Sequence, residues 1–231
     1  MGSITIEKMQ KTAVILAGGN GSRMNQLIPK QFLLLAGKPI IYYSIKAFFD
    51  AYNDFRVILV LPESSMEAGQ SICYDYFPGR NITFKSGGET RFHSVQNGIK
   101  ELLIDDIILV HDAVRCLVSP SLIRRCCDEA IRYGSAIPVI PSDDSIRYVS
   151  EIENKIIDRQ YIRLVQTPQA FQGKILLPAL RVDYKPEFTD EASVVEAWGI
   201  KTHLITGEQS NFKITRPMDL LLAEQILAST T

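Results

Sequence analysis

Short runs of apolar residues recur along the chain, and each is followed by a stretch in which apolar residues have helical spacing. The runs predict strands over 12–16, 56–61, 82–85, 107–111, 135–140, 162–166 and 201–205. The stretches between them predict helices over 39–50, 64–76, 91–103, 120–133, 174–180 and 190–198, with a last one over 217–227. Continuous apolar strands that alternate with helices predict an α/β, Rossmann-like three-layer fold. Its mostly parallel twisted sheet would have helices on both faces.

One segment departs from this alternation. Residues 145–149 and 155–158 have strand-like patterns and flank the polar stretch 150–154, which predicts a protruding β-hairpin arm. An isolated hairpin is only marginally stable in water. The arm therefore either folds back on its own domain or packs on a partner subunit, and we favour the partner.

Composition sets broad limits on the function. With 231 residues, 46% of them hydrophobic, the chain can form one domain over 1–231 with a well-buried core. The net charge of −1 gives no general attraction to nucleic acid or to an acidic membrane. No apolar run is long enough to span a membrane, so we expect a cytoplasmic protein. The four cysteines show no metal-binding or disulfide spacing, which indicates buried free thiols.

The first apolar run leads into the glycine-rich segment L-A-G-G-N-G-S-R-M over 16–24, and Lys30 follows shortly afterwards. This segment combines accessible backbone amides with the cationic side chains of Arg23 and Lys30, and that combination suits a triphosphate. Gly21 is not followed by Lys-Ser/Thr, which excludes a P-loop. Met24 stands where a dinucleotide fingerprint needs its third glycine. The alternative is a structural turn with two surface cations.

Three further segments carry candidate chemistry. Asp112 directly follows a predicted strand and could hold a divalent metal or a sugar hydroxyl, while Arg115 could bind a second phosphate; the alternative is an ion pair that braces the loop. Gly87 and Gly88 precede a predicted helix, so backbone groups there could face a base, or they could form a plain turn. Lys213 lies in a predicted short strand and points either to the surface or into a cleft.

Taken in order, the motifs resemble those of the 2-C-methyl-D-erythritol 4-phosphate cytidylyltransferases, which are sugar-nucleotidyltransferase-like enzymes of isoprenoid precursor synthesis. The resemblance covers residues 11 to 227. It rests on L-A-G-G-N-G-S-R-M, P-K-Q-F, G-G-E-T-R-F-H-S-V-Q-N-G, V-H-D-A-V-R, D-R-Q-Y-I-R-L-V-Q-T-P-Q-A-F, T-D-E-A-S-V-V-E and N-F-K-I-T-R-P-M-D-L. The ribitol-5-phosphate cytidylyltransferases share part of this set and remain the alternative. A catalytically silent nucleotide-binding protein is a third hypothesis.

The resemblance implies that CTP and a polyol phosphate react to give a CDP-polyol and pyrophosphate, with Mg²⁺ bridging the phosphate oxygens of CTP. Three cations would be catalytic: Arg23, Lys30 and Lys213. The nucleotide would be bound by Ala17, Gly18, Gly19, Gly88, Glu89 and Ser94. The polyol phosphate would be bound by Asp112, Arg115, Ser145, Arg159 and Thr167, and Asp112 could also contact the metal.

The resemblance further implies a homodimer. The arm, at about 142–159, would reach across the dimer and carry Ser145 and Arg159 to the site of the partner chain. The sequence departs from the family pattern at Cys116, where many members have a proline. A cysteine leaves φ unrestrained at this position, next to Arg115.

Overall fold

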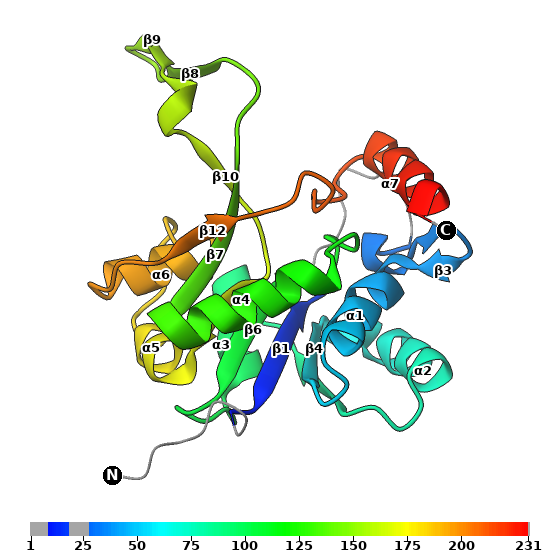
Figure 1. Cartoon of the computed structure of the whole chain (residues 1–231). Helices are drawn as coiled ribbons and strands as arrows, with labels where there is room; N and C mark the ends of the chain where they lie inside the picture. Colours follow the sequence, from blue (N-terminus) through cyan, green and yellow to red (C-terminus); the bar gives the residue numbers. More distant parts are fainter. Residues whose placement is uncertain (1–8, 19–27, 231) are drawn as a thin grey trace.

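The computed structural model describes residues 9–18 and 28–230, so the predicted site residues Gly19 and Arg23 lie outside the described part of the chain. The main sheet has the strand order β10-β7-β11-β6-β1-β4-β5, and β12 also pairs with β7 (Figure 1). Its strands are β1 (Lys11–Leu16), β4 (Arg56–Leu61), β5 (Ile82–Ser86), β6 (Ile107–Asp112), β7 (Ser135–Pro141), β10 (Arg163–Val165), β11 (Gln169–Gln172) and β12 (Leu204–Thr206).

Most of this sheet is parallel, as predicted. Strand β1 pairs in parallel with β4 on one side and β6 on the other, β4 also pairs in parallel with β5, and β12 with β7. The two antiparallel strands, β10 and β11, both pair with β7, and β11 also pairs with β6. Residues 166–168 separate them. The antiparallel ladder is therefore interrupted beside the carboxyl end of β6.

Helices cover both faces because successive strand residues point to opposite sides. Ala13 and Ile15 of β1 belong to an apolar cluster with residues of α1, α2 and α4, whereas Val14 belongs to a second cluster with residues of α3, α5 and α6. This arrangement confirms the three-layer prediction. The helices are α1 (Ile40–Ala51), α2 (Met66–Tyr76), α3 (Arg91–Ile99), α4 (Pro120–Tyr133), α5 (Gly173–Ala179), α6 (Glu191–Ala197) and α7 (Pro217–Thr230). The 3-10 turns are η3 (Lys30–Phe32), η4 (Glu63–Ser65) and η5 (Arg159–Tyr161).

Helix α4 illustrates how local sequence sets the boundaries of an element. The Ser119 side chain accepts a hydrogen bond from the Leu122 amide, and Pro120 occupies the first turn, where its missing N–H is not needed. At the other end Gly134 has φ +89°, a left-handed conformation that glycine adopts without strain. The predicted and observed bounds of this helix are therefore the same.

Three sequence predictions were wrong in detail. Strand β11 was missed, although it lies within the sheet. The predicted strand around Lys213 is absent: residues 211–215 are extended without a strand partner, and the Ile214 amide donates to the Val114 carbonyl. Helix α3 ends at Ile99 rather than at 103, because the Asp106 carboxylate accepts the Leu103 amide in a tight turn that leads into β6.

The predicted hairpin is present and forms a two-stranded sheet of its own. Strands β8 (Ile146–Val149) and β9 (Asn154–Ile157) are antiparallel, with Ile146 opposite Ile157. The arm extends away from the main sheet beyond the ends of β7 and β10 (Figure 1). A second small sheet joins β2 (Leu34–Leu35) to β3 (Lys38–Pro39), next to the C-terminal helix α7.

Candidate active site

The carboxyl ends of β1 and β6 lie side by side and place two loops next to each other. Leu16 is in register with Asp112, and the Ala113 amide donates to the Leu16 carbonyl at 3.0 Å. Ala17, the first residue after β1, donates its amide to Val60 on the neighbouring strand. The buried Gln31 amide group donates to the Ala17 carbonyl at 2.7 Å, which fixes the start of the glycine-rich segment.

The loop before α3 brings its backbone close to the helix. An added Cβ at Gly88 would lie 2.5 Å from the Cβ of His93 and 2.9 Å from its carbonyl carbon, so only glycine fits. The Gly88 amide donates to the Ser94 hydroxyl at 3.0 Å, and this hydroxyl donates to the Thr90 carbonyl at 3.0 Å. Thr90 caps the helix. The loop is thus held with backbone groups facing the ends of β1 and β6.

These loops enclose a pocket of about 280 Å³. Eight of the residues predicted for the site line it together: Ala17, Gly18, Lys30, Gly88, Glu89, Ser94, Asp112 and Lys213. The Lys30 ammonium reaches toward the Ile214 carbonyl, at 3.5 Å, next to Lys213. Backbone groups therefore line one part of the pocket and cationic side chains another.

A second pocket, of about 210 Å³, adjoins the first. Arg115 and Thr167, both predicted to bind the polyol phosphate, line it, together with Thr189 and Asp190 from the segment before α6. Three residues line both pockets: Arg91, Asp112 and Lys213. They form a shared wall, which is the name we use for this trio below.

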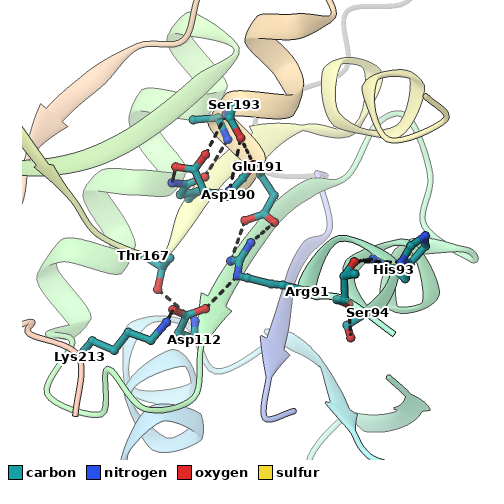
Figure 2. Close-up of polar contacts among 12 residues, drawn as sticks. Arg91, His93, Ser94, Asp112, Thr167, Asp190, Glu191, Ser193 and Lys213 are labelled. Atoms are coloured by element: carbon teal, nitrogen blue, oxygen red, sulfur yellow. Dashed lines mark hydrogen bonds and ion pairs between the residues drawn. The ribbon is translucent and has the colours of Figure 1, made fainter. Parts of the chain in front are cut away.

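The shared wall is a chain of ion pairs (Figure 2). Asp112 accepts from the Lys213 ammonium at 2.7 Å through Oδ2, and from Nε of Arg91 at 3.3 Å through Oδ1. Burial alone would raise the pKa of Asp112, but Arg91 and Lys213 outweigh burial and hold this pKa below its ordinary value. Asp112 is therefore a carboxylate at neutral pH, with both oxygens engaged by cations.

Thr167 and Arg115 are held in the second pocket by the backbone. The Thr167 hydroxyl accepts the Asp112 amide at 3.0 Å. Arg115 donates to the carbonyls of Asn211 at 2.9 Å and Val165 at 3.2 Å, so its guanidinium is fixed by the segments on either side. Cys116, next to Arg115, is buried in a small apolar cluster with Val114 and Ile214.

A buried histidine connects these two residues. His111 lies between the Thr167 hydroxyl, 3.1 Å from Nδ1, and the Arg115 carbonyl, 3.3 Å from Nε2. A carbonyl only accepts, so Nε2 carries the proton and Nδ1 accepts from Thr167. Burial lowers the pKa of His111 to about 3, which makes the ring neutral and consistent with this arrangement.

The structure does not bring every predicted residue to the pockets. Ser145 and Arg159 lie at the base of the arm and line neither pocket; Arg159 donates to the Asp143 carbonyl. Three further residues of the site, Arg91, Glu191 and His111, had no role predicted from sequence, although each lies within one of the quoted motifs. Among the described residues, no group of three His, Cys, Asp or Glu side chains is placed to hold a metal. No helix in the described ranges is both long and apolar enough to cross a membrane.

The comparisons with known proteins agree on one family. The family model for 2-C-methyl-D-erythritol 4-phosphate cytidylyltransferase matches residues 11–229. The chain belongs to this family. The enzyme of this name from Bacteroides fragilis is 39% identical over 219 residues, which cover 95% of this chain and 100% of the relative. That from Azobacteroides pseudotrichonymphae is 43% identical, with 94% and 99% coverage.

Solved structures agree with the sequence comparison. The crystal structure of the Thermus thermophilus enzyme of the same name has a TM-score of 0.75 and 31% identity, and covers 95% of this chain and 100% of its own. The corresponding Francisella tularensis structure has a TM-score of 0.77 and 29% identity, with 94% and 99% coverage. Together these findings confirm the resemblance, the fold and the nucleotidyltransferase class. They also confirm cytidylyl transfer to methylerythritol phosphate as the reaction that the motifs indicate.

The buried His111 predicts a loss of stability in mild acid. Its pKa is about 3 when folded and about 6.5 when unfolded, so the unfolded chain binds the extra proton at pH values between the two. The contribution of His111 to the free energy of unfolding is fully present above pH 6.5. It declines as the pH falls toward 3, by up to about 1.4 kcal/mol per pH unit. This pH dependence is measured by urea unfolding of the wild type and of H111Q between pH 7 and pH 4.5. The variant should lose less stability over that range, and equal slopes would contradict a neutral buried histidine.

Proposed function

We propose that the two joined pockets hold the two substrates, with CTP in the first and the polyol phosphate in the second. The observation that carries this proposal is the shared wall, since Arg91, Asp112 and Lys213 face both pockets. Backbone groups at Ala17, Gly18, Gly88 and Glu89, with the Ser94 hydroxyl, would contact the nucleotide. Arg115 and Thr167 would contact the second substrate.

In the proposed reaction, an oxygen of the polyol phosphate attacks the α-phosphorus of CTP. A new P–O bond forms, the bond to the β-phosphate bridging oxygen breaks, and pyrophosphate leaves. The attacking phosphate is largely ionised near neutral pH, so the main barrier is the meeting of two anions. Lys213 lies on the shared wall, where the two phosphates would meet, and Lys30 lies in the nucleotide pocket. Both would stabilise the negative charge that develops, as would Arg23.

A divalent cation fits this site chiefly as a partner of the nucleotide. Asp112 is the carboxylate that faces both pockets, and its two oxygens already pair with Arg91 and Lys213. A metal ion at Asp112 would have to displace one of these cations. We therefore propose that the CTP phosphates supply most of the Mg²⁺ ligands, and that Asp112 orients Lys213 and the polyol hydroxyls. When bound, Mg²⁺ would neutralise charge on the phosphates.

We also propose that the arm completes the site of a partner chain. Apolar side chains along it are exposed, with Val149 at 68%, Ile152 at 97% and Ile156 at 70%. Such side chains are costly to leave in water, and a second copy of the chain would cover them. In this homodimer Ser145 and Arg159 of one chain would approach the second pocket of the other. The cytoplasmic location expected from the sequence stays a prediction.

The substrate assignment is tested by turnover with defined substrates. The chain should release pyrophosphate from CTP with methylerythritol phosphate much faster than with ribitol 5-phosphate. It should also prefer CTP to ATP, because a pocket shaped by backbone for a pyrimidine excludes the larger base. Pyrophosphate release is measured with each pair at equal concentration. Faster turnover with ribitol 5-phosphate would favour the alternative substrate, and no turnover with either would favour a silent protein.

The proposed roles of Lys30 and Lys213 predict a loss of rate rather than of stability. Alanine at either position should lower kcat by about 10²-fold or more, because a positioned charge in the transition state is lost. The CTP affinity should change less. Steady-state kinetics and thermal melting measure the two effects, with the exposed Lys201→Ala as the control. A variant that melts early and keeps normal turnover would show that the lysine is structural.

The proposed dimer predicts complementation between two inactive variants. Arg159→Ala chains and Lys213→Ala chains should each have low activity. In a mixed dimer one site combines the intact Lys213 of one chain with the intact Arg159 of the other. Random exchange would therefore restore about one quarter of wild-type activity. Sedimentation first establishes the oligomeric state and the exchange. A monomer, or no recovery after verified exchange, would show that each site is built within one chain.

A further inference from the structure

The segment Thr189-Asp190-Glu191 has no role in the reaction proposed above, yet the fold holds it firmly against the site. Asp190 caps α6 and forms a capping box with Ser193. The Gln169 side chain of β11 donates to the Asp190 carboxylate at 2.8 Å and accepts the Ala192 amide at 2.9 Å. The first turn of α6 is thereby attached to β11, which pairs with β6. This attachment fixes the position of Glu191, whose side chain is buried and contacts Arg91.

Glu191 is 2% exposed and lines neither pocket. Its two carboxylate oxygens accept from the two terminal nitrogens of Arg91, at 2.5 and 3.0 Å. The Nε group of Arg91 then contacts Asp112, and Lys213 contacts the other Asp112 oxygen. Four side chains of alternating charge therefore run from the first turn of α6 to the shared wall (Figure 2).

Arg91 has more hydrogen-bond donors than Asp112 has oxygens, so it matters which carboxylate binds the terminal nitrogens of Arg91. A guanidinium pairs most strongly with a carboxylate through two parallel hydrogen bonds. Arg91 makes that paired contact with Glu191 and reaches Asp112 through Nε. Without the Glu191 charge, Asp112 would be the carboxylate that Arg91 still contacts. Two cations would then compete for one carboxylate, and Lys213 would lose its partner.

We infer that Glu191 is a positioning residue: by holding the terminal nitrogens of Arg91, it reserves one oxygen of Asp112 for Lys213. Glu191 acts through Arg91 and touches neither substrate. The inference rests on the proposed role of Lys213 in the reaction. Its structural part, that Glu191 keeps Lys213 paired with Asp112, can be measured without substrate.

The experiment compares E191Q with E196Q. Both replace a glutamate of α6, but Glu196 accepts from Thr202 and lies outside the ion-pair chain. Each full-length protein is labelled with acetic anhydride at limiting time, without substrate, and acetylation of Lys213 is measured by peptide mass spectrometry. A lysine released from a carboxylate reacts faster, so acetylation in E191Q should rise about threefold over wild type. In E196Q it should stay at the wild-type level.

Turnover provides the second measurement. E191Q should lower kcat by about tenfold or more, because Lys213 is no longer held in place. Its melting should stay cooperative, and E196Q should keep wild-type kcat. A folded E191Q with wild-type acetylation of Lys213 overturns the inference. If acetylation rises but kcat is unchanged, the ion-pair chain exists and its proposed part in catalysis is wrong.

A variant that keeps the charge covers the case in which E191Q does not fold. E191D retracts the carboxylate by one methylene, so the paired contact with Arg91 weakens while the negative charge remains. Acetylation of Lys213 should then rise by a smaller factor, about twofold. Unchanged labelling in folded E191D overturns the inference. If the wild type has no turnover with any polyol phosphate, the proposed function fails, while the labelling result still decides the role of Glu191.

Discussion

The ion pairs of Asp112 are the interaction on which the rest of the site depends. This carboxylate ends β6, and Arg91 and Lys213 reach it from two other parts of the chain. Its backbone amide meanwhile binds the Thr167 hydroxyl, which ties it to the segment between β10 and β11. Buried charges are stable only when they are paired and hydrogen-bonded, and removing one partner of such a pair costs about 3–5 kcal/mol. The geometry of both pockets therefore depends on the ion pairs that the Asp112 carboxylate makes.

The sheet topology explains why this carboxylate lies at the meeting point of the pockets. On one side of β6, the parallel β1 ends in the glycine-rich segment, with Leu16 in register with Asp112. On the other side, the antiparallel β11 begins just after Thr167. In open α/β sheets, ligands bind at the carboxyl ends of the strands where the connections diverge. Strand β6 lies where parallel neighbours give way to an antiparallel one, so the two pockets form on either side of its end.

The sequence was sufficient for most of the architecture because the fold follows strong local patterns. The buried runs of β1, β4 and β6 are continuous, and α4 has clear signals at both ends. Strand β11 was missed because its sequence, Gln-Ala-Phe-Gln, begins and ends with polar residues. In the structure Gln172 donates to two carbonyls near the end of α4, at Ala130 and Ile131. These hydrogen bonds join residues far apart in the sequence, so no local pattern indicates them.

The site shows a similar division. Glycine-rich segments and cations near strand ends have recognisable spacing, and the structure gathers most of them in the first pocket. The pair between Arg91 and Glu191 joins residues 100 positions apart, so no local pattern reports it. Lys213 was predicted to lie in a short strand, with the apolar residues Phe212 and Ile214 on either side of it. The Ile214 amide pairs with the Val114 carbonyl, but no strand continues the contact.

A site for two anionic substrates needs cationic side chains, and these must also be stable before the substrates bind. Arg91, Arg115 and Lys213 contribute three positive charges around the second pocket, and Asp112, Asp190 and Glu191 contribute three negative ones. These formal charges therefore balance. Burial lowers the pKa of Arg115, which shows that this cation is held against a cost of desolvation. The three carboxylates neutralise the cationic charge around this pocket in the free protein. In the proposed reaction the phosphates of the two substrates would contact the same cations, so the ion pairs would keep these cations in place until the two anions meet.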